Sequence, residues 1–292
     1  MDGGGMFSAA TDRITTAAMT DREFARFSEF IYDTCGIKMP PVKKTMLEAR
    51  LQKRLRKLGI SSFKDYSEYL FSRTGTETEL VHLIDVVTTN KTDFFREPAH
   101  FDYLVSQALP ELMERTGAGL RKPLSIWSAG CSSGEEPYTL AMVLSEFSEQ
   151  QNISFSILAT DICTTVLDKA RLAVYDEERI DPVPMSLRRK YLLRGKGEQK
   201  GLVRVVPQLR HRITFRRLNF MDGDFGMREP MDIIFCRNVV IYFDKATQER
   251  LLNKFYRQLI PGGYLFMGHS ETLSGLDVPF VQMASTVYRK PL

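Results

Sequence analysis

The sequence predicts an α/β protein in three parts: an all-α N-terminal domain, a mostly parallel sheet covered by helices on both faces, and a small antiparallel insertion. From Thr20 to about Val87, apolar residues recur only at helical spacing. After about Pro98, short apolar runs alternate with helical stretches, a pattern typical of parallel sheets. Between about Asp176 and His211, two apolar runs flank a glycine-rich stretch, which indicates a hairpin.

The N-terminal domain, residues 20–88, is expected to form four helices. Capping boxes begin at Thr20, Ser62 and Thr76, and glycines that end helices stand at Gly36 and Gly59. The second helix carries a stripe of leucines on one face: Leu47, Leu51, Leu55 and Leu58. Before this domain, residues 1–19 contain a run of three glycines and are expected to be a disordered leader.

The second domain, residues 99–292, is predicted to contain five main strands, and residues 89–98 link it to the first. The strands are expected at 124–129, 155–160, 213–218, 231–235 and 264–268. Helices near 137–147, 165–174 and 245–259 separate them. The last run, 280–289, follows without a helix and is expected as an antiparallel edge strand. The insertion, about 176–211, is expected to hold a helical turn and a small antiparallel hairpin.

The composition excludes several classes of protein. The 292 residues are 43% apolar and 26% charged, as in ordinary soluble proteins. No apolar run approaches the roughly 20 residues that span a bilayer, and no export signal is present, so a cytoplasmic location is expected. The four cysteines and four histidines are scattered, so neither disulfides nor a metal site is expected. A net charge of +4 is too small to indicate nucleic-acid binding.

The segment G-C-S-S-G-E-E-P-Y at residues 130–138 forms a turn between the first strand and the next helix. In open α/β sheets this turn is the natural cofactor site. It contains neither of the glycine patterns that cradle phosphates. Glu135 and Glu136 stand where a pyrophosphate would lie, and they suit the ammonium and sulfonium groups of S-adenosylmethionine instead. The simpler alternative is a helix whose glutamates only complement its dipole.

Asp161 closes the second strand, at the position where an acid binds ribose hydroxyls in such folds. Its alternative role is to cap the helix that begins near Thr164. Both roles are compatible with one carboxylate.

Four segments resemble one known family in order and spacing. They are T-T-N-K-T-D-F-F-R-E at 88–97, the turn at 130–138, F-C-R-N-V-V-I-Y-F at 235–243, and G-H-S-E at 268–271. Together they resemble the chemotaxis receptor methyltransferases, the CheR family, over nearly the whole chain from about Thr20. The resemblance implies a Rossmann-like S-adenosylmethionine-dependent methyltransferase domain with an inserted β-subdomain, after an all-α domain. It also implies methylation of glutamates in the cytoplasmic helical domain of methyl-accepting chemoreceptors, leaving S-adenosylhomocysteine. Nothing in the sequence suggests an obligate oligomer, so a monomer is expected.

The same resemblance assigns roles to residues of this chain. The family's cofactor-binding positions correspond to Asn90, Thr92, Arg96, Glu136, Asp161, Asn219, Phe220, Arg237 and Asn238. Arg96 and Tyr242 are expected to face the methyl group and the substrate. A glutamate carboxylate is already ionised at neutral pH, because its reference pKa is about 4.3, so it needs placement rather than a general base. The alternatives are that Arg96 only pairs with Glu97 or a helix terminus, and that Tyr242 is a core aromatic.

Two surfaces are candidate receptor contacts. Arg50, Lys53, Arg54 and Lys57 form a basic stripe on the second helix, which is either a solvated face or a docking surface for an acidic receptor helix. In the insertion, Arg194, Gly195, Gly197, Gly201 and Arg204 resemble the loop that tethers a C-terminal receptor peptide in some family members. The alternative for this loop is a hairpin tip without a partner.

The sequence disfavours two other functions. A scaffold that keeps the cofactor pocket without catalysis is disfavoured, because Arg96, Tyr242 and Asp161 are all present. A nucleic-acid methyltransferase is disfavoured, because C-R-N-V at 236–239 stands where base amino methylation often uses [DN]-P-P-[YF].

Overall fold

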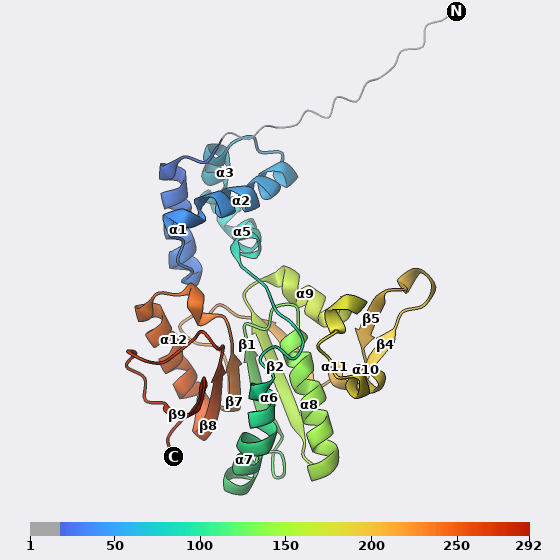
Figure 1. The fold of residues 1–292 in the computed structure, drawn as a ribbon. Helices are drawn as coiled ribbons and strands as arrows, with labels where there is room; N and C mark the ends of the chain where they lie inside the picture. The colour runs from blue at the N-terminus through green and yellow to red at the C-terminus, as the bar shows by residue number, and fades with distance from the viewer. Residues whose placement is uncertain (1–17) are drawn as a thin grey trace, which may run out of the picture. The chain divides into compact units, whose positions relative to one another are not determined.

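The structure is a computed structural model that describes residues 18–292 (Figure 1). It forms two compact units, residues 18–30 with 39–87 and residues 31–38 with 88–292. One unit is helical, and the other contains a seven-stranded sheet and a three-stranded sheet, so the predicted fold class is confirmed. Most of the expected leader lies outside the described residues. Met19, which was assigned to it, is buried in the helical unit at 2% exposure.

The helical unit follows the predicted caps closely. Its elements are α1 (Asp21–Cys35, of which residues 21–30 belong to this unit), η1 (Pro41–Lys43), α2 (Lys44–Leu58), α3 (Phe63–Leu70), α4 (Arg73–Thr78) and α5 (Leu80–Val87). The expected capping box at Thr20 is present, since its hydroxyl accepts from the Glu23 amide at 3.2 Å. Ser62 likewise accepts from the Asp65 amide, and Gly59 ends α2 in the left-handed conformation.

The fourth predicted helix is divided in two, because Glu79 does not act as part of a cap. Ser72 caps α4, and α5 begins after Glu79. The Glu79 side chain is 1% exposed. It accepts hydrogen bonds from two guanidinium nitrogens of Arg54, at 2.8 and 2.6 Å, and from the Tyr66 hydroxyl at 2.9 Å. The break in the helix thus places a buried carboxylate opposite a buried arginine.

The larger unit contains ten strands. Those of its main sheet are β1 (Leu124–Ala129), β2 (Phe155–Asp161), β6 (Ile213–Arg217), β7 (Met231–Cys236), β8 (Leu259–Met267), β9 (Val281–Ala284) and β10 (Val287–Arg289). The helices of this unit are α6 (Ala99–Tyr103), η2 (Leu104–Ala108), α7 (Leu109–Thr116), α8 (Glu135–Gln151), α9 (Thr164–Leu172), α10 (Met185–Tyr191), α11 (Pro207–Arg210) and α12 (Lys245–Gln258), with short turns η3 (Glu177–Ile180), η4 (Gly197–Gln199) and η5 (Val240–Tyr242).

The strand order of the main sheet is β6-β2-β1-β7-β8-β10-β9. The first five strands are parallel, and β10 pairs antiparallel with both β8 and β9. The chain runs outward from β1 through β2 to β6 and then returns to β7 on the other side of β1. Ligands of such sheets bind beyond the carboxyl ends of the strands at this reversal. The site is therefore expected at the ends of β1 and β7.

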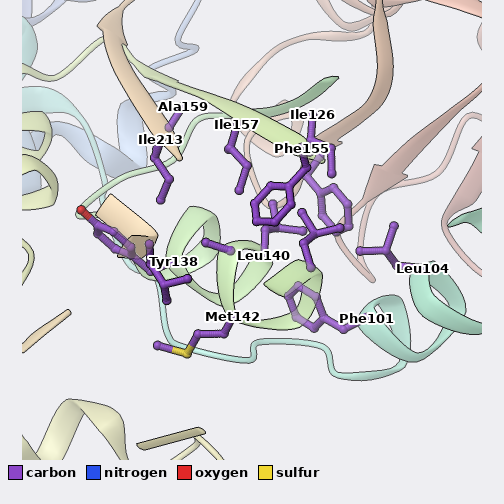
Figure 2. Close-up of a cluster of buried hydrophobic side chains, with 14 of the residues drawn as sticks. Phe101, Leu104, Ile126, Tyr138, Leu140, Met142, Phe155, Ile157, Ala159 and Ile213 are labelled. Carbon is purple, nitrogen blue, oxygen red and sulfur yellow. The ribbon is translucent and has the colours of Figure 1, made fainter. Parts of the chain in front are cut away.

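Alternate residues of the central strands feed two cores, one on each face of the sheet. Ile126 and Ile157 point into one core, together with the inner faces of α6, η2 and α8 (Figure 2). Phe235 and the buried residues of α7 belong to the same core. Trp127 and Ile234 point into the other, where Phe255 of α12 lies with its ring centroid 5.1 Å from that of Trp127. Burial on both faces explains why these strands read as continuous apolar runs.

The insertion forms a separate sheet of order β3-β5-β4, made of β3 (Val174–Asp176), β4 (Leu192–Arg194) and β5 (Leu202–Val205). The predicted hairpin is β4 with β5, and the predicted helical turn is α10. The third strand, β3, was not predicted. It begins where α9 was expected to continue, because Ala173 adopts a left-handed backbone with φ 55° that ends the helix.

Two further boundaries differ from the prediction. β8 begins at Leu259, five residues early, because the chain pairs with β7 from Met231 across a register shift. The single edge strand expected at 280–289 is a hairpin, since Thr286 turns the chain with φ 54° between β9 and β10. Within residues 18–292, none of the helices combines the length and apolarity that a bilayer crossing requires.

Candidate functional site

The turn after β1 is held by backbone geometry that requires glycine. Gly130 and Gly134 have φ of 85° and 97°. A Cβ at Gly130 would lie 2.5 Å from a methyl group of Val239, and one at Gly134 would lie 2.9 Å from Cβ of Ala170. The turn thus packs closely against the segment after β7 and against α9.

Asp161, at the end of β2, fixes this turn. One carboxylate oxygen accepts the Ser132 amide at 2.8 Å, and the other accepts the Cys163 amide at 2.9 Å, just before α9. The capping alternative raised by the sequence therefore describes part of its role. The residue is 8% exposed at the carboxyl end of the strand, where a ribose hydroxyl would bind.

A buried ionic network joins α8 to the segment after β7. The Arg237 side chain is 2% exposed and donates to Glu136 at 2.8 Å and to the Arg96 carbonyl at 2.6 Å. Glu97 lies 3.8 Å from the same guanidinium. Ser128 donates to the other oxygen of Glu136 at 2.7 Å. Arg237 thereby links three segments that lie far apart in the sequence.

The two glutamates of the turn are not free charges. Glu136 is paired with Arg237, and Glu135 accepts from Arg179 at 2.8 Å. Arg179 also reaches the Thr92 carbonyl at 2.6 Å. The charge argument for a cationic ligand is therefore weaker than the sequence indicated, because each acid is already balanced.

His100, on α6, is a member of this site that the sequence did not reveal. Its ring is buried, with Nδ1 3.4 Å from Glu97 and 3.4 Å from Arg237, and with Nε2 2.9 Å from the Thr286 hydroxyl. Burial, reinforced by the charge of Arg237, lowers the pKa of His100 to about 4. The imidazole is neutral at physiological pH.

Glu271 shapes the segment after β7. It is 3% exposed and accepts the amides of Asn238 at 2.8 Å, Gly268 at 2.7 Å and Ile241 at 3.3 Å. Burial raises the pKa of Glu271. These bonds hold Asn238 in a left-handed conformation, φ 60°, with its side-chain Oδ1 buried and without a hydrogen-bond partner. The motif G-H-S-E contained Glu271, but only the structure shows what it holds.

Tyr242 ends η5 and is half-buried. Its carbonyl accepts the Lys38 amide at 3.0 Å, and its neighbour Phe243 belongs to the core of α12. Its position on a short turn rather than in a strand agrees poorly with the alternative of a simple core aromatic, because such a residue would be fully buried.

Asn219 and Phe220 follow β6 on a loop held by cations. The ammonium of Lys254 donates to the carbonyls of Phe220 at 3.1 Å and Asp222 at 2.6 Å. Asn219 donates to the Thr34 carbonyl at 2.6 Å. Phe220 packs edge-on against Trp127 with ring centroids 6.2 Å apart. Asn219 and Phe220, which were predicted to bind the cofactor, therefore also contact other parts of the fold.

The linker contributes Asn90, Thr92 and Arg96. The Asn90 carbonyl accepts the Ser132 hydroxyl at 2.9 Å, so the linker is joined to the β1 turn. Arg96 is half-buried and donates to the Lys91 carbonyl at 3.2 Å. Glu97, its suggested alternative partner, lies instead beside Arg237 and His100.

Most predicted site residues therefore gather at one end of the sheet. Ser132 joins Asn90 to Asp161 by hydrogen bonds, and Arg237 joins Glu136 to the backbone of Arg96. Asn219 lies on the separate loop after β6. His100 and Ser128 were not predicted as site residues. They contact the charged side chains of the site, His100 beside Arg237 and Glu97, and Ser128 as a donor to Glu136. The sequence gives little indication of these two residues, because each acts through a contact that only the fold creates.

The candidate receptor contacts are less uniform than expected. On α2, Lys53 and Lys57 are exposed and Arg50 is half-buried with a bond to the Val87 carbonyl at 2.6 Å. Arg54 corrects the prediction. Its side chain is 9% exposed and forms an ion pair with Glu79, so it is not part of an exposed basic stripe.

In the insertion, the strand register separates the two arginines. Arg194 pairs with Val203 and shares its face, whereas Arg204 pairs with Leu193 on the opposite face. A pocket of about 460 Å³ lies on the Arg194 face, next to the edge strand β4, lined by Ile180, Met185, Arg188, Arg189, Arg194 and Val203, among others. Gly195 lies where a Cβ would be 2.0 Å from the Gln199 carbonyl oxygen, so the loop 195–201 requires glycine there.

The residues at the sheet end fit S-adenosylmethionine. Asp161 offers carboxylate oxygens for ribose hydroxyls, and the unpartnered Oδ1 of Asn238 is an acceptor for an ammonium group. No phosphate-binding glycine pattern is present in the sequence.

Comparison with known proteins identifies the family. Residues 22–88 match the CheR methyltransferase all-alpha domain, and residues 90–289 match the CheR methyltransferase SAM binding domain. A chemotaxis protein methyltransferase from Borreliella burgdorferi is 42% identical over 259 residues, covering 88% of this chain and 90% of that protein. Another from Klebsiella aerogenes is 40% identical over 281 residues, covering 96% and 93%.

Among solved structures, an rRNA methylase from Streptococcus thermophilus covers 70% of this chain and 100% of its own, with 14% identity and a TM-score of 0.36, a similarity too low to carry an argument. The two domain matches are contiguous and together span most of residues 18–292. The chain belongs to the CheR family of S-adenosylmethionine-dependent methyltransferases.

Proposed function

We propose that this protein transfers a methyl group from S-adenosylmethionine to glutamate side chains of bacterial chemoreceptors, in the cytoplasm, as part of chemotactic adaptation. The products are a glutamyl methyl ester and S-adenosylhomocysteine. The proposal is finer than the family assignment, because it names the acceptor atom and the protein that carries it.

The observation that carries the proposal is the contrast between two arginines at the site. Arg237 is buried and its charge is balanced by Glu136. Arg96 is half-exposed, and its guanidinium donates to a neutral carbonyl, that of Lys91. Within residues 18–292, no carboxylate lies within ion-pairing distance of Arg96. An incoming carboxylate substrate would supply the missing partner.

The chemistry suits a carboxylate acceptor. S-adenosylmethionine, when bound, supplies an electrophilic methyl group on a sulfonium. The substrate oxygen forms a bond to the methyl carbon as the carbon–sulfur bond breaks, so a carboxylate and a sulfonium become a neutral ester and a neutral thioether. No proton is removed, and His100, the nearest buried imidazole, is directed to Thr286 and Glu97 rather than to the surface.

The chain's residues then have three tasks. Asp161 and Glu136 hold polar groups of the cofactor, and Asn238 accepts from its ammonium. Arg96 places the substrate carboxylate, and the Tyr242 hydroxyl donates or accepts beside the reacting atoms. Such placement alone lowers a barrier by roughly 7–11 kcal/mol when both reactants are aligned.

The receptor helix is proposed to dock on the exposed cations of α2, Lys53 and Lys57, with Arg50 beside them. Electrostatic docking accelerates association and weakens with salt. Charge reversal in Lys53→Glu with Lys57→Glu is expected to slow methylation of receptor membranes and flatten its salt dependence. Unchanged rates at low salt, with normal cofactor binding, would exclude this surface.

The pocket beside β4 is proposed to receive a receptor's C-terminal peptide. β4 is an edge strand with unpaired backbone groups, which is the geometry for strand addition. The pocket combines apolar Ile180 and Met185 with three arginines, so its occupant is expected to carry a large apolar side chain and an acidic group.

The experiment that tests the function uses tritiated S-adenosylmethionine and membranes that bear chemoreceptors. Label that mild base releases as methanol would establish a carboxyl methyl ester. Base-stable label would move the acceptor to nitrogen or carbon and contradict the proposal. Absence of transfer to receptors from several species, despite measured cofactor binding, would favour a non-catalytic scaffold.

A further inference from the structure

Three side chains with metal-ligating atoms meet next to the site, two of them three residues apart and the third far away in the sequence. They are Glu97 in the linker, His100 on α6 and His269 after β8. One carboxylate oxygen and one ring nitrogen from each histidine lie within 4.8 Å of one another. The sequence predicted no metal site because the histidines are dispersed, and only the fold brings two of them together.

The hydrogen bonds around His100 fix which nitrogen is available. The Thr286 hydroxyl donates to the Ser285 carbonyl at 2.8 Å, so its oxygen accepts from His100 Nε2 at 2.9 Å. Nε2 therefore carries the hydrogen and Nδ1 presents a lone pair. This arrangement is the usual support for a histidine ligand, in which the second ring nitrogen donates to a fixed acceptor.

That lone pair faces the Nη1 group of Arg237 at 3.4 Å, which donates to it, and also a second acceptor. Nδ1 of His100 lies 3.4 Å from Oε2 of Glu97. The Glu97 side chain is 10% exposed, and Oε2 is buried without a hydrogen-bond partner. The Arg237 guanidinium lies beside both acceptors, 3.4 Å from Nδ1 and 3.8 Å from Oε2, so an ion bound between them would take over contacts that Arg237 now makes. A separation of about 3.3 Å is what two ligands adopt on a tetrahedral zinc ion with bonds of about 2.0 Å.

The backbone holds this carboxylate in place. Glu97 adopts a left-handed conformation with φ 57°, and Phe95 does so with φ 52°. Such conformations are sparsely populated for residues other than glycine and gather at functional positions. Oε1 of Glu97 accepts the His269 amide at 3.2 Å, which brings the exposed His269 ring to the opening of the cluster.

We propose that Glu97, His100 and His269 form a binding site for a divalent transition-metal ion of the zinc class. One carboxylate and two imidazoles are a known zinc ligand set, and the exposed side of His269 leaves a fourth position to solvent. The Arg237 guanidinium, 3.4 Å from Nδ1 and 3.8 Å from Glu97, opposes the ion. Its charge is balanced by Glu136 at 2.8 Å, which lessens that opposition.

The site is coupled to the cofactor residues through Arg237. A bound ion would compete with Arg237 for Glu97, and Arg237 also holds Glu136 and the Arg96 carbonyl. By linkage, an ion that changes affinity for S-adenosylhomocysteine must have its own affinity changed by the same factor. Zinc and the cofactor product are therefore expected to bind with mutual dependence.

The test is calorimetric titration of zinc chloride into the full chain without a histidine tag. The wild type is expected to bind one ion per chain. His269→Ala and Glu97→Gln are expected to weaken binding by about tenfold or more, since even supporting residues of metal sites change affinity by 10–100-fold. His211→Ala removes another exposed histidine and should bind zinc like the wild type.

A cobalt(II) spectrum provides the second readout. Cobalt in the wild type and in His211→Ala should give the visible bands of a tetrahedral site, and these should be lost in His269→Ala. Circular dichroism would establish that each variant is folded. Absence of zinc binding by the wild type, or equal binding by wild type, His269→Ala and Glu97→Gln, would overturn the proposal.

Discussion

At the scale of single residues, what surrounds a charge determines what it does. Arg54, Arg96 and Arg237 carry the same group in three settings. Arg54 is buried against Glu79 and stabilises the helical unit. Arg237 is buried against Glu136 and joins three segments of the site. Arg96 donates a hydrogen bond to a neutral carbonyl, so its charge is proposed to pair with the substrate carboxylate.

Arg96→Ala is expected to lower kcat/KM for receptor methylation by about 10- to 100-fold, because a hydrogen bond to a charged group contributes about 1.5–3 kcal/mol. Binding of S-adenosylhomocysteine, measured by calorimetry, should stay within a few fold of the wild type. Lys254→Arg, on α12, preserves the charge beside the loop after β6 and serves as a control. Full activity in Arg96→Ala would exclude the proposed role.

Glu79→Gln is expected to destabilise the helical unit by about 3–5 kcal/mol, because it leaves Arg54 buried without its partner. An arginine side chain is not deprotonated in proteins, so Arg54 remains charged in the variant. Lys53→Ala, on the exposed side of the same helix, should change the unfolding free energy by less than about 0.5 kcal/mol. Urea denaturation measures both. Equal effects of the two substitutions would contradict the burial of Arg54.

At the scale of elements, strand edges and helix ends place the functional groups. The turn after β1 and the segment after β7 meet at the reversal of strand order, and α12 begins just beyond Tyr242. Asp244 caps α12 by accepting the Thr247 amide at 2.8 Å, and it also accepts the Tyr32 hydroxyl at 2.6 Å. The cap therefore fixes the end of the segment that carries Tyr242.

The Asp244 cap predicts a pH dependence. The bond from Tyr32, aided by the Thr247 amide, lowers the pKa of Asp244 below its usual 3.8. Its stabilising contribution is thus complete above about pH 4 and is lost as the pH falls through the lower, folded-state pKa. The unfolding free energies of wild type and Asp244→Asn, measured between about pH 5 and about pH 2, should converge in acid, because asparagine caps without titrating. A constant difference would show that the carboxylate charge contributes nothing.

The edge strand β4 leads to a prediction about tethering. Met185→Asp introduces a charge into the pocket beside β4 and should weaken binding of a receptor with an intact C-terminal peptide by about tenfold. Methylation of a receptor that lacks this peptide should not change. Leu193→Asp, on the opposite face of β4, is the matched control. Fluorescence anisotropy of a labelled receptor tail would show either the expected difference or equal binding, which would exclude the pocket.

Sequence periodicity was sufficient for some elements but not for others. The five parallel strands and helices α2, α8 and α12 were predicted because each buries a regular apolar pattern. The division at Glu79, strand β3 and the hairpin at Thr286 were not, since each depends on a tertiary partner or on a positive φ. Asp161 and Glu136 could be proposed from their place after a strand. His100 could not, because its role arises from Thr286, which is 186 residues away.

At the scale of the whole molecule, a helical unit that carries exposed cations accompanies a methyltransferase unit with an inserted sheet. The family match accounts for both units and for their order along the chain. The two proposed receptor contacts lie on α2 and beside β4, outside the residues that gather around Arg237. The proposed division is that these surfaces select the receptor and that the end of the main sheet performs the chemistry.

The measurement that tests the central claim most directly is mass spectrometry of a receptor's cytoplasmic fragment after incubation with the protein and S-adenosylmethionine. Fragment spectra should place one added methylene unit on glutamate side chains, and mild alkali should remove it. The same incubation with Arg96→Ala should modify those glutamates at an initial rate about 10- to 100-fold lower. A methyl group located on lysine, arginine or asparagine, or one that survives alkali, would contradict carboxylate methylation.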